Sequence, residues 1–353
     1  MSMYELIEET QTQQITEGVE NSVDCIVLLV NSLPGYTKNS YDINMLGASM
    51  YNWVSRACPS KPVLVNYHED DDLLQTIKPM LKTSEYTLVL YSDTPLITAN
   101  GVNQIIDYAK LKNLSVCRLT RGWVFKTEYI KNASAIYALN TYDVCNNEQY
   151  QVNSVDNLSK ALNILQARIC KYHMQNGVNI LCPTNTYIEC SVAIESGAII
   201  EPFAKLEGTT TVGANSKICS YTVITDSKID EYAIIKPGSI VVRSAVLDNA
   251  IVGNNCLITN KSVVGEEVIV SANSVLDATT TIKGNKIGTN CILLNTKLAN
   301  GVTVGDCTKC LGSVAQDVKI GSGATIGSAC VINAGVYIKS DYVLNNGMVA
   351  NKE

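Results

Sequence analysis

The sequence predicts a small α/β domain followed by a left-handed parallel β-helix of hexapeptide repeats. Three observations carry this prediction. An aliphatic residue recurs at every sixth position from about Ile188 to the C-terminus. A small residue often follows that aliphatic residue, as in Val212-Gly213 and Val252-Gly253. Ahead of the repeat, short apolar runs typical of strands alternate with helical patterns, which is the order of an α/β domain.

The six-residue period decides the type of repeat. Helical burial recurs near every 3.6 residues and strand burial at every second residue, so a strict six fits neither alone. Six residues suit one flat face of a three-sided coil whose aliphatic side chain points to the axis. An ordinary β-sandwich would instead show period-two stretches broken by irregular turns. The six-residue pattern slips by one residue near Ile229 and Val246, and it restarts at Ile287 and again near Val314. The predicted axial residues are Ile188, Ile194, Ile200, Leu206, Val212, Ile218, Ile224, Val252, Ile258, Val264, Val270, Leu276, Ile282, Ile320, Ile326, Ile332, Ile338 and Leu344.

The chain divides by pattern into four segments. Residues 1–22 are polar and rich in Glu and Gln, and we expect a short helix or a mobile arm there. Residues 23–153 form the α/β domain, residues 154–177 a linker helix capped by Ser154, and residues 178–353 the β-helix. A parallel sheet covered on both faces is predicted from expected strands at 25–30, 62–66, 87–91 and 114–119 and expected helices at 45–58, 70–80 and 102–111.

Composition limits the partners and the compartment. A net charge of −6 with both signs spread along the chain predicts no nucleic-acid partner. No apolar run is long enough to cross a membrane, and 13 Cys without a signal peptide predict free thiols in a reducing, cytoplasmic setting. Cys307 and Cys310 could be half of a metal site or a redox pair, although no second pair or downstream His completes a tetrahedral zinc set.

Three short stretches give the chain a family resemblance. They are the strand-end sequence Leu90-Tyr-Ser-Asp-Thr-Pro-Leu-Ile97, the pair Val152-Asn153 before the linker helix, and Gly177-Val-Asn-Ile-Leu-Cys-Pro-Thr-Asn-Thr-Tyr-Ile188 at the entry to the repeat. Each is similar to a motif of the bacterial N-acetylglucosamine-1-phosphate uridyltransferase/glucosamine-1-phosphate acetyltransferase family, with Cys182 where an aspartate is usual. The domain order matches as well, so the chain resembles a divergent, shortened member of that family, with a reduced nucleotidyltransferase-like first domain.

The resemblance implies a magnesium site in the first domain. The family's strand-end aspartate and its asparagine before the linker helix hold the ion that neutralises the nucleotide phosphates, and here these would be Asp93 and Asn153. Hard oxygen ligands at the carboxyl edge of a sheet suit that role. Lys38 is the cation that could meet a phosphate. The residues alone also leave plainer roles open: Asp93 ends a strand before Pro95, and Asn153 can make a helix-entry hydrogen bond.

Much of that family's machinery for nucleotidyl transfer is missing. Such an enzyme needs a Gly-rich loop after its first strand, whose N–H groups wrap the phosphates. Here Val30 is followed by residues 31–38, which hold one glycine and one lysine. The chain between Tyr67 and Thr87 is too short for a helix plus a base-reading segment. Ala133 stands where the family's sugar-contacting asparagine is expected, so we expect uridyl transfer to be impaired.

The repeat also lacks the usual acetyltransferase base. Hexapeptide acetyltransferases commonly use a His on the coil, whereas this chain has only His68 and His173, both outside the repeat. Acetyl-coenzyme A is therefore not expected as a cofactor. The corner pair Glu266-Glu267 leaves a Glu-based acyltransferase open, although a solvated acidic pair is the plainer interpretation. Residues 68–72 could likewise bind a cation or begin a helix.

Three functional hypotheses follow, and whether the chain is an enzyme stays open. We favour a degenerate family member acting as a trimeric binding or scaffold protein, with a nucleotide sugar or sugar phosphate as the expected kind of ligand. The alternatives are an active magnesium-dependent sugar-1-phosphate nucleotidyltransferase and an acyltransferase with a site between coils. The flat coil faces predict a homotrimer. Side chains expected to pack there are Tyr187, Tyr221, Tyr232 and Tyr337.

Overall fold

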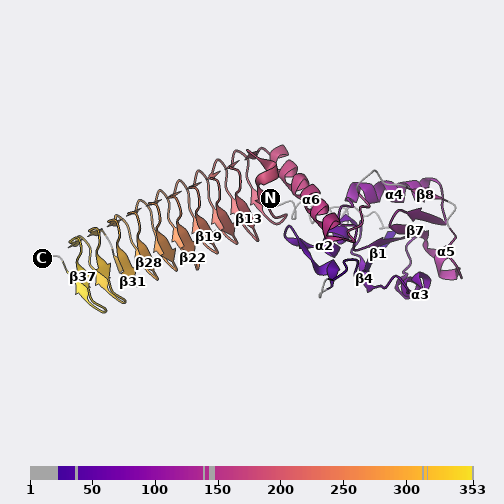
Figure 1. Cartoon of the computed structure of the whole chain (residues 1–353), viewed down its shortest axis with the longest axis horizontal. Coiled ribbons are helices and arrows are strands. Elements are labelled where there is room, and N and C mark those ends of the chain that lie inside the picture. The colour runs from indigo at the N-terminus through magenta and orange to yellow at the C-terminus, as the bar shows by residue number, and fades with distance from the viewer. Residues whose placement is uncertain are drawn as a thin grey trace. The chain divides into compact units, whose positions relative to one another are not determined.

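The computed structural model describes residues 23–35, 39–137, 140–142, 148–311, 314–315 and 317–351 (Figure 1). The chain divides into two compact units, one ending at Leu165 and the other beginning at Gln166. The predicted order of a small α/β region and then a parallel β-helix is confirmed. The expected arm at residues 1–22 and the loop residue Lys38 lie outside the described residues.

The first unit is built on a sheet whose described strands run in the order β4-β1-β5-β7-β6-β8. β1 (Val23–Leu29) pairs in parallel with β4 (Val63–Asn66) on one side and with β5 (Tyr86–Tyr91) on the other. Every residue of β5 is buried. This is the expected pattern for a central strand that is covered on both faces, since neither face can carry exposed polar side chains.

A β-hairpin distinguishes the sheet from the parallel one that the sequence predicted. β6 (Val116–Leu119) is followed by β7 (Gly122–Lys126), which lies antiparallel between β5 and β6, and β8 (Thr141–Tyr142) pairs with β6. The all-parallel prediction is wrong here because two residues separate β6 from β7, too few for a crossover helix. A Cβ at Gly122 would lie 2.7 Å from the carbonyl oxygen of Val89, so the hairpin needs glycine at this close approach.

Helices cover both faces of the sheet. α2 (Met50–Ala57) and α4 (Ala99–Leu111) contribute to the apolar core on one face. α3 (Leu73–Ile77) and α5 (Thr127–Asn132) contribute to the core on the other face. The remaining short elements of this unit are η1 (Ser40–Asp42), β2 (Asn44–Met45), β3 (Ala48–Ser49) and η2 (Lys78–Met80).

The linker helix predicted at 154–177 is α6 (Val155–Gln175). Its buried side chains include Ala161, Leu165 and Ile169, which follow one another at four-residue intervals. Gly177 follows with a φ of 87°, the left-handed conformation in which glycine commonly ends a helix.

The coil consists of three parallel sheets, each with ten strands in the described part of the chain. The first face contains β10 (Tyr187–Ile188), β13 (Lys205–Glu207), β16 (Val223–Thr225), β19 (Ile240–Val242), β22 (Leu257–Thr259), β25 (Val275–Asp277), β28 (Ile292–Leu294), β31 (Lys309–Leu311), β34 (Thr325–Ile326) and β37 (Val343–Leu344). The second face contains β11 (Ala193–Ile194), β14 (Thr211–Val212), β17 (Lys228–Ile229), β20 (Ala245–Val246), β23 (Val263–Val264), β26 (Thr280–Thr281), β29 (Lys297–Leu298), β32 (Val314–Ala315), β35 (Val331–Ile332) and β38 (Val349–Ala350). The third face contains β9 (Asn179–Ile180), β12 (Ile199–Ile200), β15 (Lys217–Ile218), β18 (Ile234–Ile235), β21 (Ile251–Val252), β24 (Ile269–Val270), β27 (Lys286–Ile287), β30 (Thr303–Val304), β33 (Lys319–Ile320) and β36 (Tyr337–Ile338).

The predicted axial residues are buried, with one exception. Ile282 is 37% exposed, whereas Thr281 is fully buried and takes the axial place. The Thr281 hydroxyl can be buried there because it donates to the Val263 carbonyl oxygen at 3.2 Å and accepts the Gly265 N–H at 3.1 Å. The six-residue pattern pointed to the neighbouring Ile282 because it counts aliphatic residues. It cannot recognise a threonine whose hydroxyl is hydrogen-bonded in the interior.

Ladders of small polar side chains explain part of the cysteine content. The Ser239 hydroxyl accepts the Cys256 N–H at 3.1 Å, and the Ser274 hydroxyl accepts the Cys291 N–H at 3.1 Å. The Cys256 thiol in turn donates to the Ser271 carbonyl oxygen at 3.1 Å. Burial raises the pKa of Cys291 to about 11 and also raises the pKa of Cys256. These thiols therefore stay protonated and occupy serine-like places in the wall of the coil.

The corner between the third and first faces turns through one left-handed residue in each turn. Phe203 has a φ of 64° and Tyr221 a φ of 60°. This conformation costs about 1–2 kcal/mol for a residue with a Cβ, and bulky residues in it are exceptional. Later turns place smaller residues at the same corner, namely Gly238, Asn255, Asn273, Asn290, Cys307, Gly323 and Asp341.

Candidate functional site

The strand-end motif places Asp93 at the carboxyl edge of the sheet. β5 ends at Tyr91, and the Ser92 N–H donates to the Leu28 carbonyl oxygen at 2.9 Å, so the motif lies beside the end of β1. Asp93 follows with no exposed surface. The edge where parallel strands end is where ligands of α/β folds are usually held.

The β6–β7 hairpin brings Arg121 to Asp93. Leu90 pairs with Gly122 across β5 and β7, so the turn before β7 lies beside the residues that follow β5. Arg121 Nε donates to Asp93 Oδ1 at 3.3 Å, and Arg121 Nη2 donates to Oδ2 at 2.9 Å. Gln151 Nε2 adds a bond to Oδ2 at 2.9 Å. Both carboxylate oxygens therefore accept hydrogen bonds from side chains of this protein.

Arg121 has further partners. Its Nη2 lies 2.9 Å from Oε1 of Glu69, and its guanidinium carbon lies 4.2 Å from the centre of the Tyr91 ring. Burial opposes the charge on Arg121, but Asp93 and Glu69 outweigh that effect, and the pKa of Arg121 is raised. Burial raises the pKa of Tyr91 to about 12, so the phenol beneath the guanidinium is neutral. The cluster is a cation held between two carboxylates and an aromatic face.

Asn153 takes part in the entry to α6. The Val152 N–H donates to the Asp93 carbonyl oxygen at 2.8 Å, which places the Val152-Asn153 pair next to the strand-end motif, as the resemblance implied. The Asn153 side chain itself accepts a bond from Asn157 Nδ2 at 2.8 Å. The Ser154 hydroxyl accepts the Asn157 N–H at 3.2 Å. Asn153 therefore makes the helix-entry hydrogen bond that was its plainer alternative.

The donors around Asp93 do not fit a magnesium ion in this arrangement. Magnesium requires oxygen ligands with free lone pairs in near-octahedral geometry. The Asp93 oxygens accept from Arg121 and Gln151, and the Asn153 oxygen accepts from Asn157. Over the described ranges, no group of His, Cys, Asp and Glu is arranged to hold a metal ion. The assignment of Asp93 and Asn153 as magnesium ligands stays a prediction.

The loop after β1 uses its own side chains to satisfy its backbone. The Val30 N–H donates to the Ser92 hydroxyl at 3.0 Å and the Ser32 N–H to the Ser40 hydroxyl at 2.9 Å. The Ser40 N–H donates to Asn31 Oδ1 at 3.0 Å. A phosphate-binding loop needs such N–H groups free to point at the ligand. The N–H groups of Val30, Ser32 and Ser40 are already bonded, and Lys38 lies outside the described residues.

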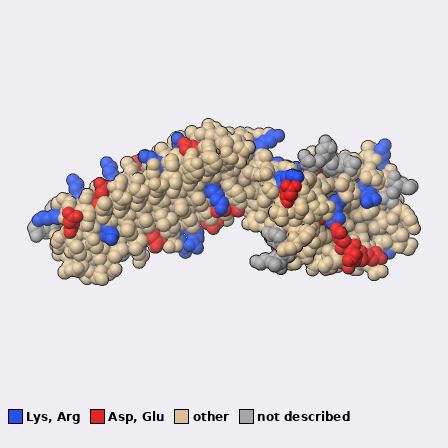
Figure 2. Space-filling model, in the orientation of Figure 1, with Lys and Arg blue, Asp and Glu red and all other residues tan. Residues whose placement is uncertain are grey.

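Acidic side chains surround the approach to Asp93. Figure 2 shows Asp and Glu side chains gathered over the first unit near β4 and α3, where residues 69–72 are all acidic and exposed. Asp72 caps α3, because its carboxylate accepts the N–H groups of Leu74 and Gln75. The helix-start interpretation of this stretch is therefore confirmed. Its charge opposes a polyphosphate near Glu69.

The candidate residues of α6 and of the coil are not arranged as catalytic groups. Lys283 lies 3.4 Å from Glu266 Oε2 and 3.0 Å from Glu267 Oε1, so the acidic pair forms an exposed ion pair rather than a poised base. His173 lies on α6 and is 1% exposed. Burial lowers the pKa of His173 to about 4. Cys310 is buried while Cys307 is exposed on a corner, so the two thiols do not form a shared site.

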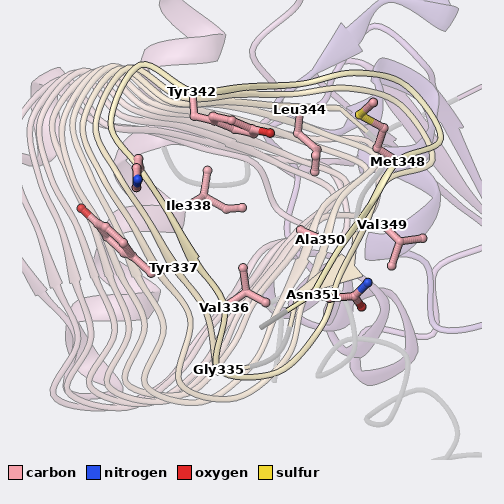
Figure 3. A pocket seen from close by; sticks show the side chains of 11 residues that line it. Gly335, Val336, Tyr337, Ile338, Tyr342, Leu344, Met348, Val349, Ala350 and Asn351 are labelled. Atoms are coloured by element: carbon pink, nitrogen blue, oxygen red, sulfur yellow. The ribbon is translucent and has the colours of Figure 1, made fainter. Parts of the chain in front are cut away.

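The described part of the coil has hollows on its surface, and two of them are considered for binding. A shallow groove of about 490 Å³ crosses the corner between the first and second faces and is lined by Lys228, Arg243, Lys261 and Asp226, with hydroxyls between them. A cavity of about 610 Å³ lies at the last turn, where Figure 3 shows Ile338 and Leu344 pointing into the interior. The second hollow is the end of the apolar axis, whereas the first could bind an anion.

Sequence reasoning missed the residues that decide the chemistry at Asp93. Arg121 and Gln151 carry no motif, and their role depends on where the hairpin and the entry to α6 lie. A usable signal was present in the apolar runs on either side of Thr120-Arg121, because a two-residue connection predicts a hairpin. That hairpin would have placed an arginine at the same edge as the strand-end aspartate.

Comparison with known proteins shows which proteins the chain is similar to. Residues 185–298 match the family model of the GMPPB C-terminal domain. The bifunctional protein GlmU of Koribacter versatilis is 31% identical over 196 residues, covering 53% of this chain and 42% of that protein. GlmU of Enterococcus faecalis is 27% identical over 320 residues, covering 71% and 70%. The chain is GlmU-like over these matched ranges. This GlmU-like chain spans about half the length of several relatives, with 42% and 45% covered in Koribacter versatilis and Brevibacillus brevis.

Solved structures show only weak similarity to the chain. The UDP-N-acetylglucosamine acyltransferase of Francisella novicida is 17% identical with a TM-score of 0.23, covering 45% of this chain and 62% of that one. The Arabidopsis UDP-N-acetylglucosamine acyltransferase is 14% identical with a TM-score of 0.28, covering 46% and 66%. These values are too low to compare sites.

None of the helices in the described ranges has the length and apolar character needed to cross a bilayer.

Replacing Arg121 should test how much the first unit depends on the ion pair. Arg121→Ala leaves the Asp93 carboxylate buried without its counter-ion, so the free energy of unfolding should fall by about 3 kcal/mol or more. Glu69→Ala removes a partner whose side chain is 70% exposed and should cost less than about 1 kcal/mol. Urea unfolding monitored by Trp53 and Trp123, both in the first unit, measures the difference. Equal losses in the two variants would contradict the assigned roles.

Proposed function

We propose that this GlmU-like chain is a binding or scaffold protein whose first unit does not catalyse nucleotidyl transfer. The observation that carries the proposal is the contact of Arg121 with both carboxylate oxygens of Asp93. A nucleotidyltransferase needs a cation at this edge that can bridge to the phosphates of its substrate. A guanidinium fixed to the chain neutralises Asp93 but leaves its oxygens unavailable to a metal.

Electrostatics support this choice. A doubly charged ion about 4 Å from the Arg121 guanidinium would be repelled by roughly 8 kcal/mol at an effective dielectric constant of about 20. The ion would also have to displace the bonds from Arg121 and Gln151 to Asp93. The bonded N–H groups of Val30 and Ser32 supply no compensating phosphate contact. Each effect acts against the same step, the binding of a metal–polyphosphate complex.

The first alternative is an active magnesium-dependent nucleotidyltransferase. It requires Arg121 to leave Asp93, so that Asp93 and Asn153 can turn to the metal and Lys38 to a phosphate. The exposed partner of Arg121, Glu69, offers a place for the arginine to remain after such a movement. We rank this function second because the hydrogen bonds from Arg121 and Gln151 to the buried Asp93 would have to break before a metal could bind.

The second alternative places the chemistry on the coil. The groove is lined by Lys228, Arg243, Lys261 and Asp226, and Lys228 is paired with Asp230 at 2.8 Å. Arg243 and Lys261 then outnumber the Asp226 carboxylate, which favours an anionic ligand such as a sugar phosphate. An acyltransferase would in addition need a general base, and Glu266 and Glu267 are engaged with Lys283. The groove therefore supports binding of an anion more directly than acyl transfer.

The proposed assembly is a homotrimer that packs through the first face of the coil. Val223, Ile240, Leu257, Val275 and Ile292 follow one another in register on consecutive strands of that face. Their side chains point outward, and Ile240 and Leu257 are 39% and 36% exposed. A continuous apolar column of this kind is a common feature of a protein interface. Of the tyrosines expected to pack in the trimer, Tyr187 lies on the first face and is partly covered. Tyr221 and Tyr232 lie on corners and Tyr337 on the third face, so these three are not part of the proposed interface.

Pyrophosphate release distinguishes the proposed function from the first alternative. The protein would be incubated with each nucleoside triphosphate, N-acetylglucosamine 1-phosphate or glucose 1-phosphate, and Mg²⁺, with GlmU of Enterococcus faecalis as the positive control. We expect no release above the blank, because no metal can reach Asp93. Magnesium-dependent release that Asp93→Asn abolishes would refute the proposal and support the nucleotidyltransferase.

Sedimentation velocity tests the proposed trimer. The wild-type protein should sediment as a trimer at micromolar concentration, and Ile240→Asp combined with Leu257→Asp should sediment as a monomer. Val331→Asp is the matched control, because Val331 is 44% exposed but lies on the second face. A monomeric wild type, or dissociation caused equally by the control, would rule out this interface.

A further inference from the structure

Two aromatic side chains form an exposed stack on a corner of the coil. The rings of Phe203 and Tyr221 have centroids 5.0 Å apart and planes that differ by 6°. Phe203 is 48% exposed and Tyr221 is 64% exposed. They occupy the same corner in consecutive turns, because Ile200 and Ile218 pair across β12 and β15. The two rings together form an exposed apolar patch, and such patches can mark interaction sites.

The backbone under this stack is held in an unfavourable conformation. Phe203 and Tyr221 have φ values of 64° and 60°, where later turns place Gly238, Asn255 and Asn273. Glycine and asparagine adopt such a conformation more readily than an aromatic residue. The exposed rings contribute little burial in return. Local strain of this kind is commonly retained where the side chain has a binding role.

On the side of the next turn, the stack meets an opening that is bounded by Gly238 and by the Asn255 side chain, whose Oδ1 reaches to where a Cβ on Gly238 would stand. Gly238 follows Tyr221 in register, because its N–H donates to the Ser220 carbonyl oxygen at 3.1 Å. Gly238 places no side chain beyond the Tyr221 ring. Neighbouring strands of a sheet are about 4.8 Å apart, so the spacing of the turns suits a third planar ring in the same column.

A free cation lies next to this opening. Lys236 precedes Gly238 by two residues on the same turn, is exposed, and forms no ion pair within the described ranges. The neighbouring Lys217 is instead paired with Glu201 at 2.8 Å. An anionic group attached to a ring stacked on Tyr221 would therefore meet Lys236 rather than a neutralised pair.

We propose that Phe203 and Tyr221 form a stacking platform for the base of a nucleotide, whose phosphate contacts Lys236. The base continues the column of rings above Gly238, and stacking requires no particular hydrogen-bonding edge. The ligand class agrees with the proposed binding function, but the platform uses none of the residues around Asp93. Binding here needs no metal, so its failure can be told apart from that of the proposed function.

The test is a titration of the full-length protein with AMP and UMP in a buffer containing EDTA, followed by calorimetry or ligand-observed NMR. Adenosine lacks the phosphate and ribose 5-phosphate lacks the base. We expect AMP and UMP to bind, and both truncated compounds to bind more weakly. Tyr221→Ala should weaken binding of AMP by about tenfold. Absence of binding, or equal binding by Tyr221→Ala, would overturn the proposal.

Two controls separate a binding role from a structural one. Tyr232→Ala changes a tyrosine that is also left-handed and exposed but lies on a different corner, and it should leave AMP binding unchanged. Gly238→Asn fills the opening, and its Cβ requires the Asn255 side chain to turn aside. It should block AMP binding, and the melting temperature of the variant reports whether the coil stays folded. Tyr221→Asn should leave the melting temperature unchanged or raise it. A marked fall would mean that the stack holds the fold rather than a ligand.

Discussion

The ion pair between Arg121 and Asp93 constrains the whole carboxyl edge of the first unit. Asp93 is fully buried, so its charge needs a partner in every folded molecule. The hairpin supplies that partner within the chain, and Gly122 permits the close approach of β7 to β5 on which the contact depends. The loop after β1 and the entry to α6 then bond to one another around the pair. At this edge, the positive charge beside Asp93 comes from the Arg121 side chain and not from a bound metal ion.

The coil shows the opposite arrangement, since its interior is fixed and its corners are free to vary. The axis is filled by buried aliphatic residues, with Thr281 accepted where its hydroxyl is bonded. The corners require only a left-handed residue and otherwise tolerate many side chains. A corner can therefore carry Arg243 in a basic groove or Tyr221 in an aromatic stack without disturbing the axis. Binding functions on this fold are expected at corners for that reason.

The sequence predicted the features that arise from repetition and from short-range pattern. The six-residue period gave the coil and nearly all of its axial residues, and the strand-end motif gave the position of Asp93. Pattern could not predict Arg121, because its contact depends on the register of β7 against β5. It could not choose between a metal ligand and a helix-entry bond for Asn153, since both roles use the same amide oxygen. Ile282 was predicted to be axial because the period counts aliphatic residues and overlooks a hydrogen-bonded Thr281.

The most direct test of the account is a measurement of Mn²⁺ binding by electron paramagnetic resonance, in which bound ions lose the signal of the free ion. Mn²⁺ has the same preference for oxygen ligands as magnesium and reports binding without any nucleotide or activity. The account predicts no stoichiometric, Asp93-dependent site in the wild-type protein, because Arg121 already occupies both carboxylate oxygens. One bound Mn²⁺ per chain that is lost in Asp93→Asn would contradict it.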